Sequence, residues 1–205
     1  MHSTTQLPTL SRSDLNDIQI LALDRAFTPD RWMSIPEALN LLSRDAISYH
    51  LGETALTLRG GINAATGKQS TLNLGSIIVL KSNQWLVRDH HHSPFSRTLL
   101  FKRDKHLCAY CGNRFHTSEL TMDHILPASR NGETSWTNIV TACKSCNQKK
   151  ADRTPSEANM ALLYVPYQPN RNEWLILRNR HVLADQMEFL CSHLPAHSRI
   201  LQPLN

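Results

Sequence analysis

Two Cys-x-x-Cys pairs, Cys108/Cys111 and Cys143/Cys146, constrain the fold of this chain more than any other feature of its sequence. Each pair lets two thiolates reach one metal ion, and two pairs complete the tetrahedral four-sulfur shell that Zn²⁺ takes. Such a shell leaves no open position for water, so we expect a structural Zn²⁺ that pins together the ends of the segment between the pairs. Disulfides and buried free thiols are the alternatives. The polar N-terminal stretch lacks the apolar core of a secretory signal, which disfavours disulfides, and free thiols do not need paired spacing.

Asp123 and His124 lie next to each other between the cysteine pairs, in an alternating stretch (120–126) that predicts a short strand ending before Pro127. Neutral imidazole is a good acceptor of a proton from water, and a carboxylate is an oxygen ligand suited to Mg²⁺ or Mn²⁺. Adjacent strand residues point to opposite faces, so both serve one site only if the strand ends or bends there. Taken alone, such a pair is more often a hydrogen-bonded surface pair than a catalytic one.

The order of the motifs along the chain resembles that of a known protein family. Asp-His-Ile-x-Pro-x-Ser begins at residue 123, Trp-Thr-Asn ends at Asn138, and Cys-x-x-Cys-Asn ends at Asn147 with two lysines shortly after it. This arrangement resembles the HNH nuclease family, whose core is the ββα-metal finger. Arg103-Asp104, ahead of Cys-x-Tyr-Cys-Gly, resembles the zinc-bearing branch of that family. The resemblance covers residues 96 to about 167.

The resemblance implies a role for each motif residue. His124 takes the place of the general base that activates water, and Asn138 matches the residue that orients the base by tying the loop together. Asp123 and Asn147 match the ligands of a catalytic divalent cation, Mg²⁺ or Mn²⁺. The third motif position is Asn147 where the family name has a histidine, a variant also found in the family.

The implied reaction is hydrolysis of a phosphodiester bond, with duplex DNA as the expected partner. A homodimer is one way for a single site per chain to cut both strands. Two other interpretations stay open at this point: a non-catalytic zinc-stapled module that binds nucleic acid, and a zinc-stapled protein-interaction domain. Asp123, His124 and Asn147 argue against the first, because simple binding does not need a base beside a hard-metal ligand.

The positive charge of the chain is concentrated in the motif segment. Residues 1–95 hold eight basic and eight acidic residues and residues 154–205 hold four of each, whereas residues 96–153 hold ten basic and five acidic ones. An excess of positive charge around a phosphodiester site favours nucleic-acid binding, although a solvated charged surface explains it equally well. The basic residues predicted to contact nucleic acid are Arg97, Lys102, Arg103, Arg130, Lys149 and Lys150.

The predicted fold class is α+β: an HNH ββα-metal finger with a four-cysteine zinc site, preceded by a small α/β region and followed by C-terminal helices. The predicted boundaries are a flexible tail at 1–14, the α/β region with its connector at 15–95, the nuclease domain at 96–167 and a helical extension at 168–205. The connector holds a His90–His92 run that could bind a metal ion but is interpreted as a solvated linker or phosphate-facing loop. No stretch is apolar enough to predict a membrane span, and the reduced cysteines fit the cytoplasm.

Local patterns predict the elements within these regions. Strands are expected at 18–24, 46–50, 55–58 and 76–81, with a loop at 60–67. Helices are expected at 34–44, 96–104, 144–150, 154–163 and 180–193, while residues 172–177 fit either a strand or a helix.

Overall fold

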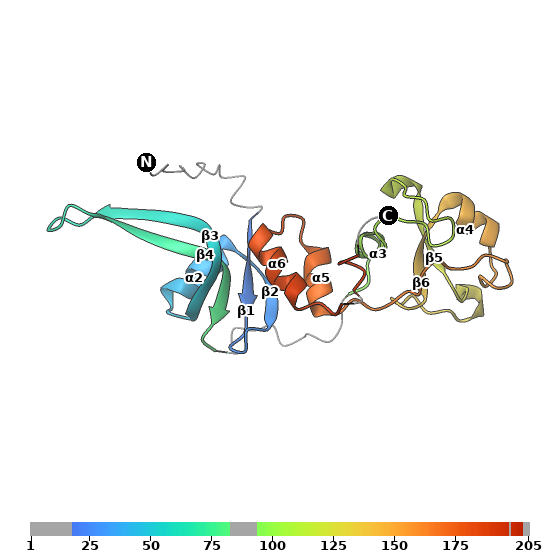
Figure 1. The fold of residues 1–205 in the computed structure, drawn as a ribbon, viewed down its shortest axis with the longest axis horizontal. Coiled ribbons are helices and arrows are strands. Elements are labelled where there is room, and N and C mark those ends of the chain that lie inside the picture. Colours follow the sequence, from blue (N-terminus) through green and yellow to red (C-terminus); the bar gives the residue numbers. More distant parts are fainter. Residues whose placement is uncertain (1–17, 83–93, 197, 203–205) are drawn as a thin grey trace. The chain divides into compact units, whose positions relative to one another are not determined.

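The computed structural model describes residues 18–82, 94–196 and 198–202. The described residues form two compact units (Figure 1): 18–82 with 179–193 in one, and 94–178 with 194–196 and 198–202 in the other. The tail expected at 1–14 and the His90–His92 run lie outside the described residues. Within those residues, no helix has the length and apolar character needed to cross a membrane.

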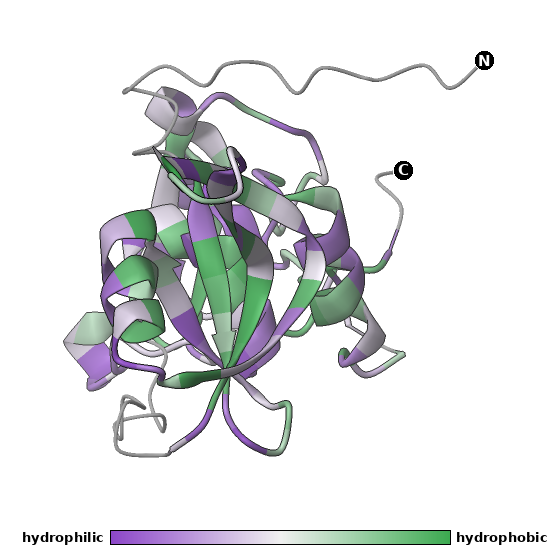
Figure 2. Cartoon of the chain, turned by 90° about the vertical axis from the view of Figure 1, so that its left-hand side faces the viewer, coloured by the Kyte–Doolittle hydropathy of each residue, from purple (hydrophilic) through white to green (hydrophobic). Residues whose placement is uncertain are grey.

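The first unit is built on a four-stranded mixed sheet with strand order β2-β1-β4-β3. The strands are β1 (Gln19–Leu23), β2 (Pro29–Ser34), β3 (Ile47–Ile62) and β4 (Gln69–Leu80). β1 pairs antiparallel with β2 and parallel with β4, and β3 pairs antiparallel with β4. Figure 2 shows hydrophobic residues (green) along the central strands in that view. The buried core of this unit includes Ile20, Met33, Leu41, Leu74 and Ile78.

The two short strands expected at 46–50 and 55–58 are one continuous strand, β3, which pairs with β4 as a long ribbon (Figure 1). Gly52 lies between them with φ +71°, a conformation that favours glycine, and the register with β4 shifts between Leu51 and Thr54. The helix predicted at 34–44 is α2 (Ile35–Ser43), and the Ser34 side chain caps it by accepting a hydrogen bond from the Glu37 amide.

The segment 168–205 contributes a helix to each unit: α5 (Arg171–Arg178) to the second and α6 (Ala184–Ser192) to the first. In the first unit, the buried Gln186 side chain on α6 donates hydrogen bonds to the carbonyl oxygens of Gln19 and Ser76, each at 2.8 Å. Helix α6 is therefore hydrogen-bonded to β1 and β4 of the N-terminal sheet, although it lies far from them in sequence.

The second unit contains the predicted ββα arrangement. Strands β5 (Leu120–His124) and β6 (Ile139–Cys143) pair antiparallel, and helix α4 (Lys144–Lys150) follows β6 directly. Helix α3 (Arg97–Arg103) lies within the helix predicted at 96–104 and precedes the first cysteine pair, and the Ser96 hydroxyl caps it by accepting from the Leu99 amide. Short 3-10 helices, η2 (Thr117–Glu119) and η3 (Ala128–Arg130), flank β5. The α+β fold class, with its ββα finger, N-terminal sheet and C-terminal helices, is confirmed.

The helix predicted at 154–163 is wrong, because this stretch is a turn followed by extended chain. Its capping box does form: Thr154 Oγ1 accepts from the Glu157 amide at 3.3 Å, and Glu157 Oε2 accepts from the Thr154 amide at 2.9 Å. Asn159 then adopts φ +54°, the left-handed conformation that ends helices. The Leu163 amide instead donates to the carbonyl oxygen of Ala109 at 2.8 Å, which ties the segment to the first cysteine turn.

A fully buried guanidinium, that of Arg103, joins the parts of the second unit. It donates to both carboxylate oxygens of Asp104, at 2.8 and 3.1 Å, and to three backbone carbonyl oxygens at 2.6–3.1 Å, those of Trp136, Ile139 and Tyr167. These contacts account for all five N–H donors that an arginine has. Asp104 Oδ2 also accepts from the Thr141 amide at 3.0 Å.

Replacing Arg103 with lysine is expected to destabilise the second unit by about 2–4 kcal/mol, because lysine has three donors and cannot replace at least two of the five buried hydrogen bonds. The measurement is hydrogen–deuterium exchange of the β5 and β6 amides, which reports the opening free energy of this unit alone. Arg180, which is exposed in the first unit, provides the control: Arg180→Lys should change stability by less than about 0.5 kcal/mol. Equal exchange in the two variants would contradict the role assigned to Arg103.

Candidate active site and metal centre

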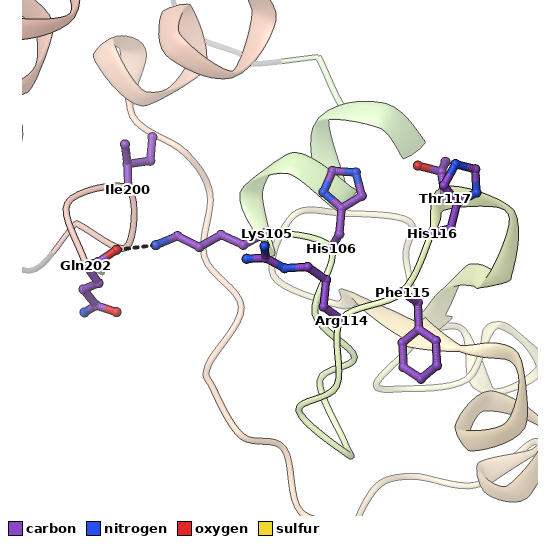
Figure 3. A pocket seen from close by; sticks show the side chains of 8 residues that line it. All are labelled: Lys105, His106, Arg114, Phe115, His116, Thr117, Ile200 and Gln202. Carbon is purple, nitrogen blue, oxygen red and sulfur yellow. Dashed lines mark hydrogen bonds between the residues drawn. The ribbon is translucent and has the colours of Figure 1, made fainter. Parts of the chain in front are cut away.

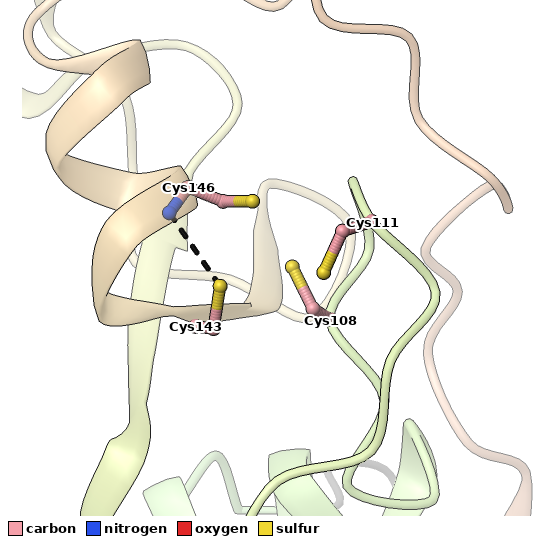
Figure 4. Close-up of side chains that lie close together, drawn as sticks. All are labelled: Cys108, Cys111, Cys143 and Cys146. Atoms are coloured by element: carbon pink, nitrogen blue, oxygen red, sulfur yellow. Dashed lines mark hydrogen bonds between the residues drawn. The ribbon is translucent and has the colours of Figure 1, made fainter.

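The four paired cysteines converge on one point. Figure 4 shows the side chains of Cys108, Cys111, Cys143 and Cys146 turned toward one another, and their sulfur atoms all lie within 4.8 Å of each other. Cys108 and Cys111 occupy a tight turn in which the Gly112 amide donates to the Cys108 carbonyl oxygen at 3.0 Å. Cys143 ends β6 and Cys146 lies in the first turn of α4. The cluster therefore joins the turn after α3 to the start of the finger helix.

The donor set fits a zinc ion. In a tetrahedral shell with Zn–S bonds of about 2.3 Å the sulfurs lie about 3.8 Å apart, so the cluster needs only a small contraction. Burial raises the pKa of Cys143, but hydrogen bonds from the Ser145 hydroxyl and the Cys146 amide outweigh it and lower that pKa to about 7. The four clustered cysteines are thus consistent with a structural Zn²⁺, as predicted.

Asp123 is buried on β5 and has two partners. Its Oδ1 accepts from Lys150 Nζ at 2.9 Å, and both side chains of this ion pair are at most 5% exposed. Its Oδ2 accepts a hydrogen bond from the hydroxyl of Tyr110, which lies between Cys108 and Cys111. Burial raises the pKa of Tyr110, and the hydrogen bond to Asp123 raises it further, so the phenol stays a donor at neutral pH. The cysteine turn and α4 therefore both hold this carboxylate.

Asn147, on α4, faces the same side of β5. Its Nδ2 donates to Thr121 Oγ1 at 2.9 Å, and Thr121 lies two residues before Asp123, on the same face of the strand. This hydrogen bond leaves the amide oxygen of Asn147 available. A carboxylate has about four acceptor sites, and the two hydrogen bonds to Asp123 leave others open. Asp123 and Asn147 thus offer hard oxygen donors from facing elements, the chemistry that Mg²⁺ or Mn²⁺ requires.

His124 is the last residue of β5, so the strand ends where it must end if Asp123 and His124 are to serve one site. It pairs with Ile139 in regular register, so its side chain leaves the face that carries Asp123. The ring is partly exposed, and its Nε2 lies 3.1 Å from Thr134 Oγ1. His124 is therefore open to solvent on one side and contacts the β5–β6 connection on the other.

Asn138 holds that connection closed. Its Oδ1 accepts from the Leu126 amide at 2.9 Å, and its Nδ2 donates to the carbonyl oxygens of Leu126 and Glu133 at 3.1 and 2.9 Å. The Asn138 carbonyl oxygen also accepts from the Ile125 amide at 2.9 Å. One side chain thus fixes the backbone on both sides of the loop that begins immediately after His124.

Two of the basic residues predicted to contact nucleic acid are buried. Arg103 is 1% exposed and bound to Asp104, and Lys150 is 1% exposed and bound to Asp123. The expected phosphate contacts are not compatible with these positions, because a charge enclosed by protein cannot meet a phosphate on the surface. Both expectations are corrected: these two residues stabilise the unit from within.

The other basic candidates differ in whether their side chains already bind groups of the protein itself. Arg97 donates to the Leu120 carbonyl oxygen at 2.8 Å, and Lys102 donates to that of Leu177 at 2.8 Å. Arg130 forms an exposed ion pair with Glu157 at 2.7 Å, and hydrogen bonds from Arg130 and from the Thr154 amide lower the pKa of Glu157 to about 2. Lys149 is exposed, on the outer side of α4.

Sequence reasoning missed three residues of this site: Thr121, Tyr110 and Thr134. Thr121 had a usable signal, since it lies two positions before Asp123 in an alternating strand and so shares its face. Tyr110 was interpreted only as part of the cysteine motif. Thr134 had no local signal, because its contact with His124 depends on how the β5–β6 connection folds back.

The comparisons with known proteins concern this part of the chain. A family model described as HNH endonuclease matches residues 108–163. The CRISPR-associated endonuclease Cas9 of Campylobacter jejuni is 40% identical over 65 residues, which cover 29% of this chain and 7% of that protein. That of Corynebacterium diphtheriae is 44% identical over 46 residues, covering 22% of this chain and 4% of that protein. The chain therefore spans less than a tenth of either relative.

The matched family region begins at the first paired cysteine and includes both strands and the helix of the finger. It contains each of the motif residues whose positions are described above: Asp123, His124, Asn138 and Asn147. With its cluster of four cysteines, the segment 108–163 is an HNH endonuclease domain.

Proposed function

We propose that this protein is a metal-dependent endonuclease that hydrolyses phosphodiester bonds in DNA, with a structural zinc ion on its four cysteines. The observation that carries the proposal is the arrangement of the finger. An imidazole, His124, ends β5 one position after the buried carboxylate of Asp123 and leaves the strand on its other face, and Asn147 approaches that strand from α4. A module that only binds nucleic acid needs neither a base nor hard-metal ligands.

His124 serves as the general base. When Nε2 donates its proton to Thr134 Oγ1, the lone pair on Nδ1 is the site that accepts a proton from water. Asn138 acts as a positioning residue, because its hydrogen bonds fix the backbone that follows His124. Asp123 and Asn147 would hold the divalent cation, which would stabilise the negative charge that develops on the phosphate.

A second candidate function, a non-catalytic zinc-stapled nucleic-acid-binding module, is favoured by one contact. The ammonium of Lys150 lies 2.9 Å from Asp123 Oδ1, where it neutralises the carboxylate that would hold the catalytic cation. The two functions differ in what they require of His124, so a substitution at that residue separates them.

We expect His124→Ala to lower the rate of DNA cleavage by about 10²–10⁴-fold, because the substitution removes the proton acceptor and leaves binding surfaces in place. The measurement is nicking of supercoiled DNA in Mg²⁺ or Mn²⁺, with zinc content and DNA affinity determined on the same sample. His181→Ala, at an exposed histidine of the first unit, is the matched control and should cleave normally. Cleavage unchanged in His124→Ala would exclude the proposed base.

Replacing Cys143 with serine is expected to have a different effect. It removes one thiolate from the cluster, and because structural zinc binding is coupled to folding, the second unit should lose its zinc, its protease resistance and its activity together. Limited proteolysis and metal analysis check this expectation. A Cys143→Ser protein that stays folded and protease-resistant would count against a structural zinc.

Tyr110→Phe tests the connection between the cysteine turn and Asp123. The variant lacks only the hydroxyl that donates to Asp123, a bond to a charged group worth about 1.5–3 kcal/mol. We expect zinc to be retained and the Mg²⁺ or Mn²⁺ concentration for half-maximal cleavage to change, because the carboxylate loses one of its two restraints. A metal-ion titration identical to that of the wild type would show that the hydroxyl does not act on the site.

A further inference from the structure

A pocket at the base of the cysteine turn gathers basic side chains that the proposed active site does not use. Its volume is about 590 Å³, within the range of small-molecule sites. Lys105 and His106 line it from the end of α3, and Arg114 and His116 line it from the segment after the second cysteine (Figure 3). Leu107 and Arg114 form a backbone bridge that holds the two segments side by side.

No acidic side chain lines this pocket among the residues that the structure describes. A nearby carboxylate, Glu119, is turned toward the backbone and accepts from the His116 amide at 3.3 Å. Another, Asp104, is fully buried and bound to Arg103 and the Thr141 amide. The positive charge of the pocket is therefore not neutralised by these two carboxylates.

The cations of the pocket keep free donor capacity. In the described part of the chain, the guanidinium of Arg114 has no hydrogen bond or ion pair to an acid, and Arg114 is exposed. Lys105 Nζ donates to the Gln202 carbonyl oxygen at 2.6 Å (Figure 3) and has two further N–H groups. Burial lowers the pKa of Lys105, and repulsion from Arg199 and Arg114 lowers it further, an effect that a bound anion would relieve.

The backbone that presents two of these side chains is strained. Lys105 and His106 adopt φ +55° and φ +59° in succession, a conformation that L-residues with side chains rarely take. Glycine is the usual residue at such positions after a helix, yet this chain keeps a lysine and a histidine there. Strain of this kind is typical of sites where the side chain has a function.

We propose that this pocket binds one backbone phosphate of the nucleic-acid strand through Lys105 and Arg114. The proposal rests on the proposed nuclease function and extends it: the pocket is a second contact with the strand, outside the residues that carry the chemistry. Arginine suits this role because its planar donors match two phosphate oxygens at once. A phosphate contact is insensitive to base sequence, so the pocket contributes affinity and position without sequence preference.

Equilibrium binding to a labelled duplex, in a His124→Ala background that prevents cleavage, tests the proposal. At about 0.1 M salt, Arg114→Ala should weaken binding about tenfold and equally for two duplexes of unrelated sequence. The slope of log K against log salt should become shallower by about 0.9, the value for one lost phosphate contact. Lys105→Ala combined with Arg114→Ala should reduce the slope by the same amount, because both side chains serve one phosphate.

Two further variants separate binding from folding. Lys105→Gly relieves the backbone strain, so we expect thermal stability to be equal or higher while duplex affinity falls. Arg180→Ala removes the same charge from an exposed position of the first unit and should leave the salt slope unchanged. Inorganic phosphate and a mononucleotide are tested as competitors: displacement of the duplex only at far higher concentrations assigns the pocket to a backbone phosphate, whereas tight binding of either would reassign it to a free ligand and overturn the proposal.

Cleavage by the same variants with His124 restored distinguishes this proposal from the nuclease proposal. If the wild type cleaves DNA and Arg114→Ala binds with unaltered affinity and salt slope, the pocket proposal is wrong and the nuclease proposal stands. If the wild type binds but does not cleave, and Arg114→Ala binds more weakly, the pocket proposal stands and the nuclease proposal is wrong. A wild type that binds no DNA even at low salt would overturn both.

Discussion

The buried ion pair of Arg103 and Asp104 is the interaction on which the second unit depends. Arg103 reaches the backbone at Trp136, at Ile139 and at Tyr167, which lie before β6, at its start and in the segment after the finger helix. A buried guanidinium is costly unless all its donors are matched, so these three segments are restricted to the positions that satisfy it. The same pair sets the place from which the first cysteine turn begins, because Asp104 ends α3.

The cysteine cluster and the candidate catalytic residues are coupled through a short path. Tyr110 is placed by the turn between Cys108 and Cys111, and its hydroxyl contacts Asp123. Cys143 and Cys146 place the start of α4, the helix that carries both Asn147 and Lys150 toward β5. An ion held by the four sulfurs would therefore position the carboxylate from two sides.

Patterns that depend on sequence neighbours were reliable guides to this fold. The helices predicted at 34–44 and 96–104, the short strand around Asp123 and His124 and the convergence of the paired cysteines all follow from local chemistry, and each occurs as expected. The helix predicted from the capping box at Thr154 failed for the same local reason: its hydrogen bonds are complete within one turn, and nothing in the box requires the helix to continue.

Whether a cation faces solvent or the interior was beyond such reasoning, because the answer depends on partners distant in sequence. Lys149 and Lys150 are neighbours on one helix, yet the first is exposed and the second meets a carboxylate 27 positions earlier in the chain. Arg103 and Lys150 are buried, so they do not contribute to the positive charge that residues 96–153 present to a partner. It gathers in part at Lys105 and Arg114, at the base of the cysteine turn. The positive surface of the second unit therefore depends on its tertiary structure, because it is formed by the basic residues that do not take part in buried ion pairs.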